Sequence, residues 1–173
     1  FIRLGVDSYA GPEEYYPLLN EFFDYLEKTY GFQVVIAAHP RSRYEDHPDY
    51  FGGRSVLRGD TVKMVRGSSS VITHCSTSIN FAILFEKPII FVTSDKLQKT
   101  YEGAYIDAMA KALGKKSINL NRDIDIDIGG QLMVDGNAYR RYKNAYIKNE
   151  ESEDLPFWQL FAKYLKASPD IVN

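Results

Sequence analysis

Apolar and polar positions alternate along the chain with two periods, one typical of strands and one typical of helices. Residues 2–6 read as a strand, and residues 32–38 are a continuous apolar run, as in a strand covered on both faces of a sheet. Between them, the apolar residues of 15–26 recur at helical spacing. Pro12 suits the first turn of this helix, and Gly31 is a typical helix end.

The chain is organised around residues 71–92, which read VITHCSTSINFAILFEKPIIFV. The apolar run over 71–75 predicts a strand, and the apolar residues of 79–85 predict a helix. Pro88 ends that helix before a second strand over 89–92. This stretch therefore predicts one β-α-β unit.

The remaining pattern continues the alternation of strands and helices. We expect helices over 61–66, 101–113, 138–148 and 156–165, a half-exposed strand or loop over 117–128, and an acidic linker over 150–155. The tyrosines at 139, 142 and 146 are expected to pack one helix face. Together these elements predict a single α/β domain over residues 1–173 with a mainly parallel sheet, in which residues 150–173 form a C-terminal linker and helix.

Loops that follow parallel strands meet at one edge of a sheet, where ligands bind in such folds. The loops at Asp7, His39, Cys75 and Thr93 each follow an expected strand. We therefore expect a binding site at this shared edge.

The composition is that of an ordinary globular protein, with 45% hydrophobic and 25% charged residues. The net charge of −2 argues against binding of nucleic acid by bulk electrostatics. Cys75 is the only cysteine, which excludes a disulfide within the chain. No apolar run approaches the length of about 18 residues that a membrane-spanning helix needs. Because the chain opens on strand-like residues without an initiator Met, we expect it to be a fragment of a longer polypeptide.

The hydroxyl triplet Ser76-Thr77-Ser78 stands where the central helix begins. Ser and Thr are preferred helix caps, and a helix N-terminus carries partial positive charge that suits an anion such as phosphate. The triplet therefore either caps the helix only or cradles a phosphate group.

His39-Pro40, followed by Arg41 and Arg43, is the second candidate group. An imidazole at a strand end can donate to a phosphate oxygen, and guanidinium groups match phosphate with forked donors. The alternative is a polar strand end with solvated arginines. The joint occurrence with the serine triplet favours a phosphate site.

Other chemistries find less support in the pattern. The three histidines and Cys75 lack the spacing of a zinc site, and the Asp/Ile repeat at 123–128 lacks the Gly and Glu positions of a calcium loop. We find no Walker or dinucleotide fingerprint and no nucleophile elbow around Ser76. His47 lies in a loop, and we interpret His74 as a hydrogen-bonded structural residue.

The run VVIAAHP at 34–40, followed by the stretch 71–92 and then by Ser94-Asp95 and Tyr101, resembles the carboxyl-terminal half of a GT-B glycosyltransferase. The resemblance is to capsule and teichoic-acid enzymes, namely CDP-glycerol glycerophosphotransferases, capsule Kdo transferases and bacterial sialyltransferases and polysialyltransferases. These share a His-Pro motif and a later Ser-Ser or Ser-Thr motif at a helix start. The resemblance covers residues 2–105.

This resemblance implies a Rossmann-like three-layer domain, one half of a GT-B fold, that binds a CMP-, CDP- or UDP-linked donor in bacterial surface polysaccharide synthesis. It implies no metal and no further cofactor. The implied partners are a saccharide acceptor and a missing amino-terminal domain that supplies the general base, so the fragment alone would turn over nothing. The implied location is the cytoplasm, with association at the inner face of the plasma membrane left open.

The resemblance also implies roles for particular residues. His39 would be catalytic, and the donor phosphate would contact Pro40, Arg41, Arg43, Ser76, Thr77 and Ser78. Further candidate donor contacts are Asp7, Tyr9, Thr61 and Asp95.

Two departures from the family pattern keep the donor identity open. Many relatives have a carboxylate where this chain has Asn80 and Phe81, and His74-Cys75 replace an Asp-Tyr pair. The alternatives are a UDP-sugar 2-epimerase-like domain and a non-catalytic α/β interaction module. A flavodoxin-like regulatory module would need an acidic cluster or flavin loop that we do not find.

Overall fold

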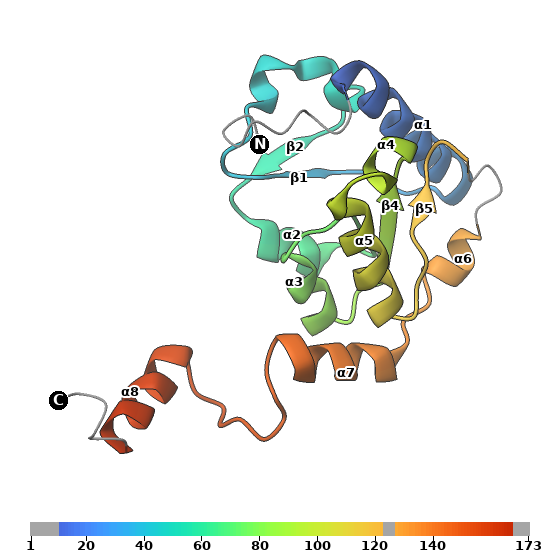
Figure 1. Ribbon diagram of the computed structural model, residues 1–173. Coiled ribbons are helices and arrows are strands. Elements are labelled where there is room, and N and C mark those ends of the chain that lie inside the picture. The colour runs from blue at the N-terminus through green and yellow to red at the C-terminus, as the bar shows by residue number, and fades with distance from the viewer. Residues whose placement is uncertain (1–10, 123–126, 168–173) are drawn as a thin grey trace.

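The computed structural model of the protein describes residues 11–122 and 127–167. It is an α/β structure in which short parallel strands are flanked by helices, in agreement with a Rossmann-like three-layer domain (Figure 1). The strand expected over 2–6, together with Asp7 and Tyr9, lies outside the described residues.

The described strands form two parallel sheets. One has the order β3-β4-β5 and consists of β3 (Val71–Thr73), β4 (Ile89–Thr93) and β5 (Ile118–Asn119). The other pairs β1 (Ile36–Ala38) with β2 (Val56–Arg58). The helix α3 (Ile79–Leu84) connects β3 to its parallel neighbour β4, which confirms the central β-α-β unit.

Helices make up most of the remaining described chain. They are α1 (Pro12–Tyr30), α2 (Thr61–Gly67), α4 (Asp95–Gln98), α5 (Tyr101–Ala112), α6 (Ile128–Gln131), α7 (Gly136–Tyr146) and α8 (Phe157–Ala167), with two 3-10 turns, η2 (Tyr44–Asp46) and η3 (Pro48–Phe51). The helices expected over 12–30, 61–66, 101–113, 138–148 and 156–165 are thus confirmed within two residues at each end.

The core is built on β4, in which every residue is buried. Ile89 and Phe91 belong to a hydrophobic cluster formed with α3, α5 and α7. Ile90 and Val92 belong to a second cluster formed with α1. Because successive side chains of a strand point to opposite faces, β4 joins the two helical layers.

The strand expected over 32–38 is wrong for most of its length. Only Ile36–Ala38 form β1, and Val35 is 43% exposed. The backbone N–H of Val34 donates to Glu27 Oε1 of α1 at 3.1 Å rather than to a neighbouring strand. This segment therefore runs beside α1 and is not covered on both faces of a sheet.

Two other expectations also need correction. The segment 117–128 holds the short strand β5, residues 123–126 are not described, and a helix rather than a strand or loop begins at Ile128, which is buried. In α7, Tyr139 and Tyr142 are buried, whereas Tyr146 contacts the Tyr142 ring at 4.7 Å between centroids but is itself 68% exposed.

The guanidinium of Arg54 fastens α1 to the segment that follows η3. Its Nη2 lies 2.7 Å from Glu27 Oε2 and 2.5 Å from Asp24 Oδ1, and its side chain is only 9% exposed. A nearby Asn20 Oδ1 accepts from Arg54 Nη1 at 3.0 Å. Hydrogen bonds from Arg54 hold the pKa of both Glu27 and Asp24 below the usual range.

The last helix, α8, stands apart from the body at the end of an extended linker (Figure 1). Its length and composition do not allow it to span a bilayer, and the same is true of every other helix in the described part of the chain.

The replacement Phe91→Ala should remove a ring from the buried face of β4. We expect a loss of about 3–5 kcal/mol in the free energy of unfolding, since neighbouring elements cannot close the cavity. Urea unfolding followed by circular dichroism measures it. The matched control is Leu84→Ala in α3, where the side chain is 47% exposed and the loss should stay within about 1 kcal/mol. Equal losses in both variants would contradict the central position of β4.

The Arg54 cluster should make stability depend on pH. The pKa values of Glu27 and Asp24 are lower in the folded than in the unfolded chain, so their contribution is complete above about pH 5 and is lost as the pH falls through the folded-state values. We therefore expect Arg54→Met to lower the urea midpoint at pH 7 more than at pH 3. Arg58→Met, which removes an exposed pair with Glu45, should have little effect at either pH.

Candidate binding site at the carboxyl ends of β4 and β5

The serine triplet forms a tight turn before α3. Ser76 Oγ and Ser78 Oγ are 2.7 Å apart, and the Ser78 N–H donates to Ser76 Oγ at 3.2 Å. The backbone N–H groups of residues 79–81 donate to the carbonyls of residues 76–78, each at 3.1 Å. The Ser78 side chain makes no capping hydrogen bond. The N–H groups of residues 78–81 and one of the two serine hydroxyls therefore donate within the turn, and the other serine O–H is left to donate elsewhere.

His39 lies exposed just after β1. Its Nδ1 accepts from the Arg41 N–H at 3.1 Å, which assigns the proton of the neutral ring to Nε2. The Ser42 hydroxyl donates to the His39 carbonyl at 2.7 Å and closes the turn through Pro40. Arg41 and Arg43 are exposed. This loop thus presents one imidazole N–H and two guanidinium groups to solvent.

The structure does not bring this loop into contact with the serine triplet. β1 pairs with β2 and not with β3, so the two segments leave different sheets. Within residues 11–122 and 127–167, no hydrogen bond or ion pair joins residues 39–43 to residues 76–78. Thr61 begins α2, which follows β2 and packs against α3 through Val65.

A hollow of about 460 Å³ opens at the carboxyl ends of β4 and β5. Ser94 directly follows β4, and Asn121 comes two residues after β5. The opposite wall is the first part of α1. The residues that line the hollow are Glu14, Tyr15, Pro17, Leu18, Ser94, Asp95, Lys96, Lys99 and Asn121.

Asp95 anchors the loops around this hollow to each other. Its backbone N–H donates to Asn121 Oδ1 at 2.9 Å, and its Oδ1 accepts from Asn119 Nδ2 at 2.9 Å. Arg122 Nε lies 2.6 Å from the same oxygen. The hydrogen bond from Asn119 and the ion pair with Arg122 lower the pKa of Asp95, which is therefore ionised at neutral pH.

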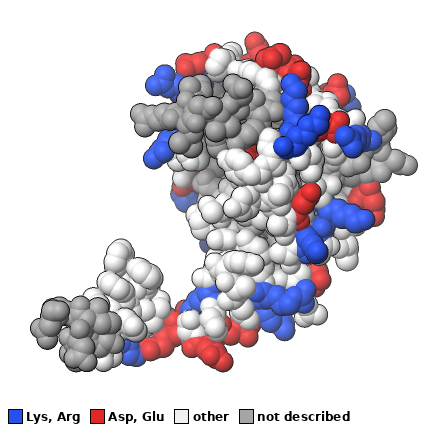
Figure 2. Space-filling view, in the orientation of Figure 1, with Lys and Arg blue, Asp and Glu red and all other residues white. Residues whose placement is uncertain are grey.

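The two lysines of the hollow differ in their surroundings. Lys96 forms an ion pair with Glu14 of α1, whereas the Lys99 side chain makes no hydrogen bond or close ion pair to the described residues, and its charge acts on Asp95 from a longer distance. The lining itself is balanced, with Glu14 and Asp95 against Lys96 and Lys99, and Arg122 beside Asp95 adds one positive charge at the edge of the hollow. In Figure 2 Lys and Arg side chains lie over α4, with Asp and Glu side chains beside them.

Tyr15 connects the hollow to the half-buried His74. The Val92 carbonyl lies 2.6 Å from His74 Nδ1 and can only accept, so this nitrogen carries the proton. Nε2 is then the acceptor for the Tyr15 hydroxyl. Burial lowers the pKa of His74 and raises that of Tyr15, and both groups are neutral at pH 7. The interpretation of His74 as a hydrogen-bonded structural residue is confirmed.

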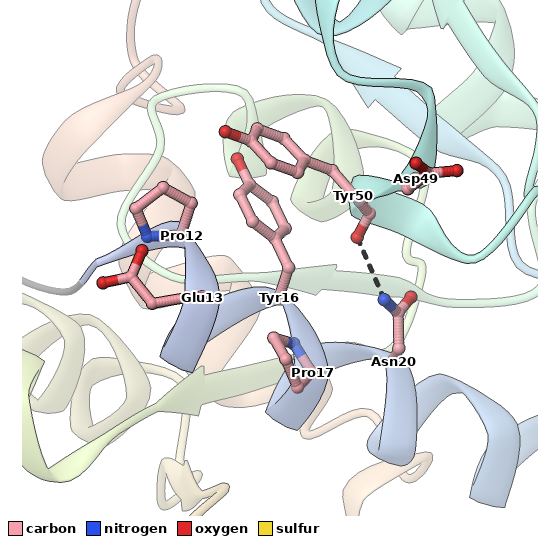
Figure 3. Close-up of a pocket in the computed structure, with 7 residues that line it drawn as sticks. All are labelled: Pro12, Glu13, Tyr16, Pro17, Asn20, Asp49 and Tyr50. Carbon is pink, nitrogen blue, oxygen red and sulfur yellow. Dashed lines mark hydrogen bonds between the residues drawn. The ribbon is translucent and has the colours of Figure 1, made fainter.

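A second hollow of about 410 Å³ lies on the other side of the α1 N-terminus and shares Pro17 with the first (Figure 3). The rings of Tyr16 and Tyr50 stack 3.9 Å apart, and His47 stacks on Tyr50 at 4.4 Å. Asn20 Nδ2 donates to the Tyr50 carbonyl at 3.0 Å. Since the Tyr50 ring is covered on both faces, it offers a ligand only its edge and hydroxyl.

Among the predicted site residues, only Asp95 lines either hollow, while the predictions for Asp7 and Tyr9 lie outside the described residues. Sequence reasoning missed Lys96, Lys99 and Asn121. Lys96 and Lys99 stand just after the predicted strand 89–92, so two cations at a strand's carboxyl end were the available signal. No set of three or more His, Cys, Asp or Glu side chains placed to hold a metal ion occurs in the described segments.

Comparisons with protein-family models, curated proteins and solved structures found no significant match to this chain. The resemblance to GT-B glycosyltransferases therefore stays a prediction, and the geometry of the hollow carries the functional argument.

The buried state of His74 can be tested by NMR. Its ring protons should titrate below the ordinary value of about 6.5, because burial disfavours the charged ring. Since the unfolded chain binds this proton more readily, stability should fall as the pH drops below about 6.5. Tyr15→Phe should cost about 1–3 kcal/mol at pH 7 by leaving Nε2 without its donor. Tyr146→Phe, at an exposed ring, is the control. A titration midpoint at or above 6.5 would contradict the assignment.

Proposed function

We propose that the chain is the donor-binding domain of a metal-independent GT-B glycosyltransferase or glycerophosphotransferase. Its substrate would be a nucleotide-activated donor used in bacterial surface polysaccharide synthesis. The observation that carries the proposal is the lysine-lined hollow at the carboxyl ends of β4 and β5, the position where parallel α/β sheets bind ligands.

The chemistry of the hollow suits a phosphate group. Lys99 makes no close ion pair with a described carboxylate, although its charge acts on Asp95, and it can pair with a phosphate oxygen as a point charge. The Oδ1 of Asn121 already accepts from Asp95, so its Nδ2 remains available as a second donor. Ser94 holds α4 in place by accepting from the Leu97 N–H at 3.3 Å. These groups would stabilise negative charge on a leaving nucleotide without a metal ion.

In this proposal His39 is the second source of leaving-group stabilisation. Its Nε2–H faces solvent, and Arg41 and Arg43 are exposed beside it. The acceptor hydroxyl would be activated by a base in a further, amino-terminal domain. The proposed location is the cytoplasm, at or near the inner face of the plasma membrane.

The engaged donors of the Ser76–Ser78 turn favour a second candidate, a non-catalytic α/β interaction module. Such a module would keep the sheet but bind no nucleotide. A UDP-sugar 2-epimerase-like domain is the alternative enzyme, and a product assay on a two-domain protein separates it from a transferase.

Calorimetric titration with CMP, CDP, UMP and UDP tests the proposal. We expect a diphosphate to bind with an affinity that falls as salt is added, and Lys99→Ala to weaken it by about tenfold. The matched control is Lys63→Ala, which removes an exposed lysine of α2 outside both hollows.

His39→Ala provides the second arm of this titration. Weaker binding in both the Lys99 and His39 variants would mean that the two segments share one ligand. A loss of affinity in His39→Ala alone would place the phosphate-binding site in the loop after β1. An absence of heat with every nucleotide would contradict donor binding and favour the interaction module.

A further inference from the structure

The helix α8 exposes a continuous apolar stripe. Phe157 is 66% exposed, Phe161 43% and Tyr164 60%, and these positions recur at helical spacing together with the half-buried Leu160 and Leu165. Trp158, at the edge of the stripe, is 73% exposed.

The rings of α8 contact mainly each other. Phe157 and Phe161 are stacked with centroids 6.0 Å apart, and Trp158 lies against both at 5.1 and 6.2 Å. In Figure 1 the helix is separated from the sheet and its covering helices by the linker. Large contiguous apolar surfaces of this kind mark interaction sites.

Charge is separated along the same segment. The linker before α8 is acidic and carries Glu150, Glu151, Glu153 and Asp154, whereas the second half of α8 is basic and carries Lys163 and Lys166. Three of these groups have partners, since Lys163 Nζ lies 2.6 Å from Glu153 Oε1 and Asp154 pairs with Lys148, which follows α7. Glu150, Glu151 and Lys166 make no side-chain hydrogen bond or ion pair to the residues described.

We propose that α8 is a dimerisation helix that packs against α8 of a second copy in antiparallel orientation. In that orientation the basic end of each helix lies beside the acidic linker of the other copy, so Lys166 meets Glu151 twice. A parallel pair would place acidic linkers side by side and lysines side by side. The antiparallel arrangement also opposes the two helix dipoles.

The surface available is close to what a specific pair requires. An aromatic side chain buries roughly 150–250 Å² when covered, so the stripes of two copies would together remove about 1,000 Å² from water. Specific interfaces bury a total of about 1,200 Å² or more, and the flanking ion pairs would add to the area of the contact. We therefore expect a reversible dimer in the micromolar range.

The charge of the segment disfavours an anionic membrane as the occupant. Residues 150–167 hold four carboxylates and two lysines, a net charge of −2. Interfacial helices that bind anionic lipid carry an excess of Lys and Arg instead. A second copy offers carboxylates to the lysines and lysines to the carboxylates, whereas an anionic membrane offers negative charge only.

Trp158 is the only tryptophan of the chain and reports directly on this contact. Sedimentation equilibrium over a concentration series should show a monomer–dimer equilibrium, and Trp158 emission should shift to shorter wavelength over the same range. Phe161→Asp should abolish both signals while far-ultraviolet circular dichroism and the urea midpoint of the body stay unchanged. Gln159→Glu, at a position outside the stripe, is the matched control and should leave the dimer intact.

Charge reversal tests the orientation. Lys166→Glu and Glu151→Lys should each weaken the dimer by about three- to tenfold, and the double variant should restore it, because every reversed pair is again opposite in charge. In a parallel pair neither single variant would weaken the contact, and that result would overturn the antiparallel arrangement.

Three results would overturn dimerisation through α8. The first is a monomer at the highest soluble concentration. The second is a dimer that survives Phe161→Asp, which would place the contact on another surface. The third is a monomer that sediments with vesicles of phosphatidylcholine and phosphatidylserine, which would identify lipid as the occupant. None of these depends on nucleotide binding, so this proposal and the proposed function can fail separately.

Discussion

Burial of β4 on both faces is the constraint on which the rest of the structure depends. The strand pairs with β3 on one side and β5 on the other, which satisfies backbone groups that water cannot reach. Its alternating side chains join a layer containing α3, α5 and α7 to a layer containing α1. The point where the chain leaves this strand is therefore held in place by the whole core.

The burial of β4 also fixes the position of the candidate site. Ser94 is buried at the end of β4, and Asp95 is tied to Asn119, Asn121 and Arg122 at the end of β5. Lys99 lines the same hollow and makes no close ion pair with a described carboxylate, although its charge acts on Asp95. In the serine turn before α3, the N–H groups of residues 78–81 and one serine hydroxyl donate within the turn instead. The carboxyl end of β4 is thus better suited to bind an anion than the Ser76–Ser78 turn, which is the more conspicuous motif in the sequence.

The helix α8 does not take part in the hydrophobic core built around β4. Its composition matches that of the core, but no element among the described residues covers it, and its aromatic rings stay largely exposed. The acidic linker and the basic end of the helix have the charge pattern of a self-complementary contact. A chain that keeps such a surface gains stability from association rather than from its own core.

The central β-α-β unit, α1 and α5 could be predicted because their apolar residues repeat with the period of a strand or a helix. The helices α4 and α6 could not, since four residues show no period and their caps, Ser94 and Asp127, look like loop residues. The apolar run before β1 was misread because its backbone bonds go to a helix side chain. The sequence by itself determined which long segments are helices, which short ones are strands, and that Asp95 follows a strand. Only the tertiary structure decided that β1 pairs with β2, that β5 lies beside β4, and hence that Lys99 and Asn121 share one hollow. Strand pairing depends on contacts between residues far apart in the chain, and local periodicity carries no information about them.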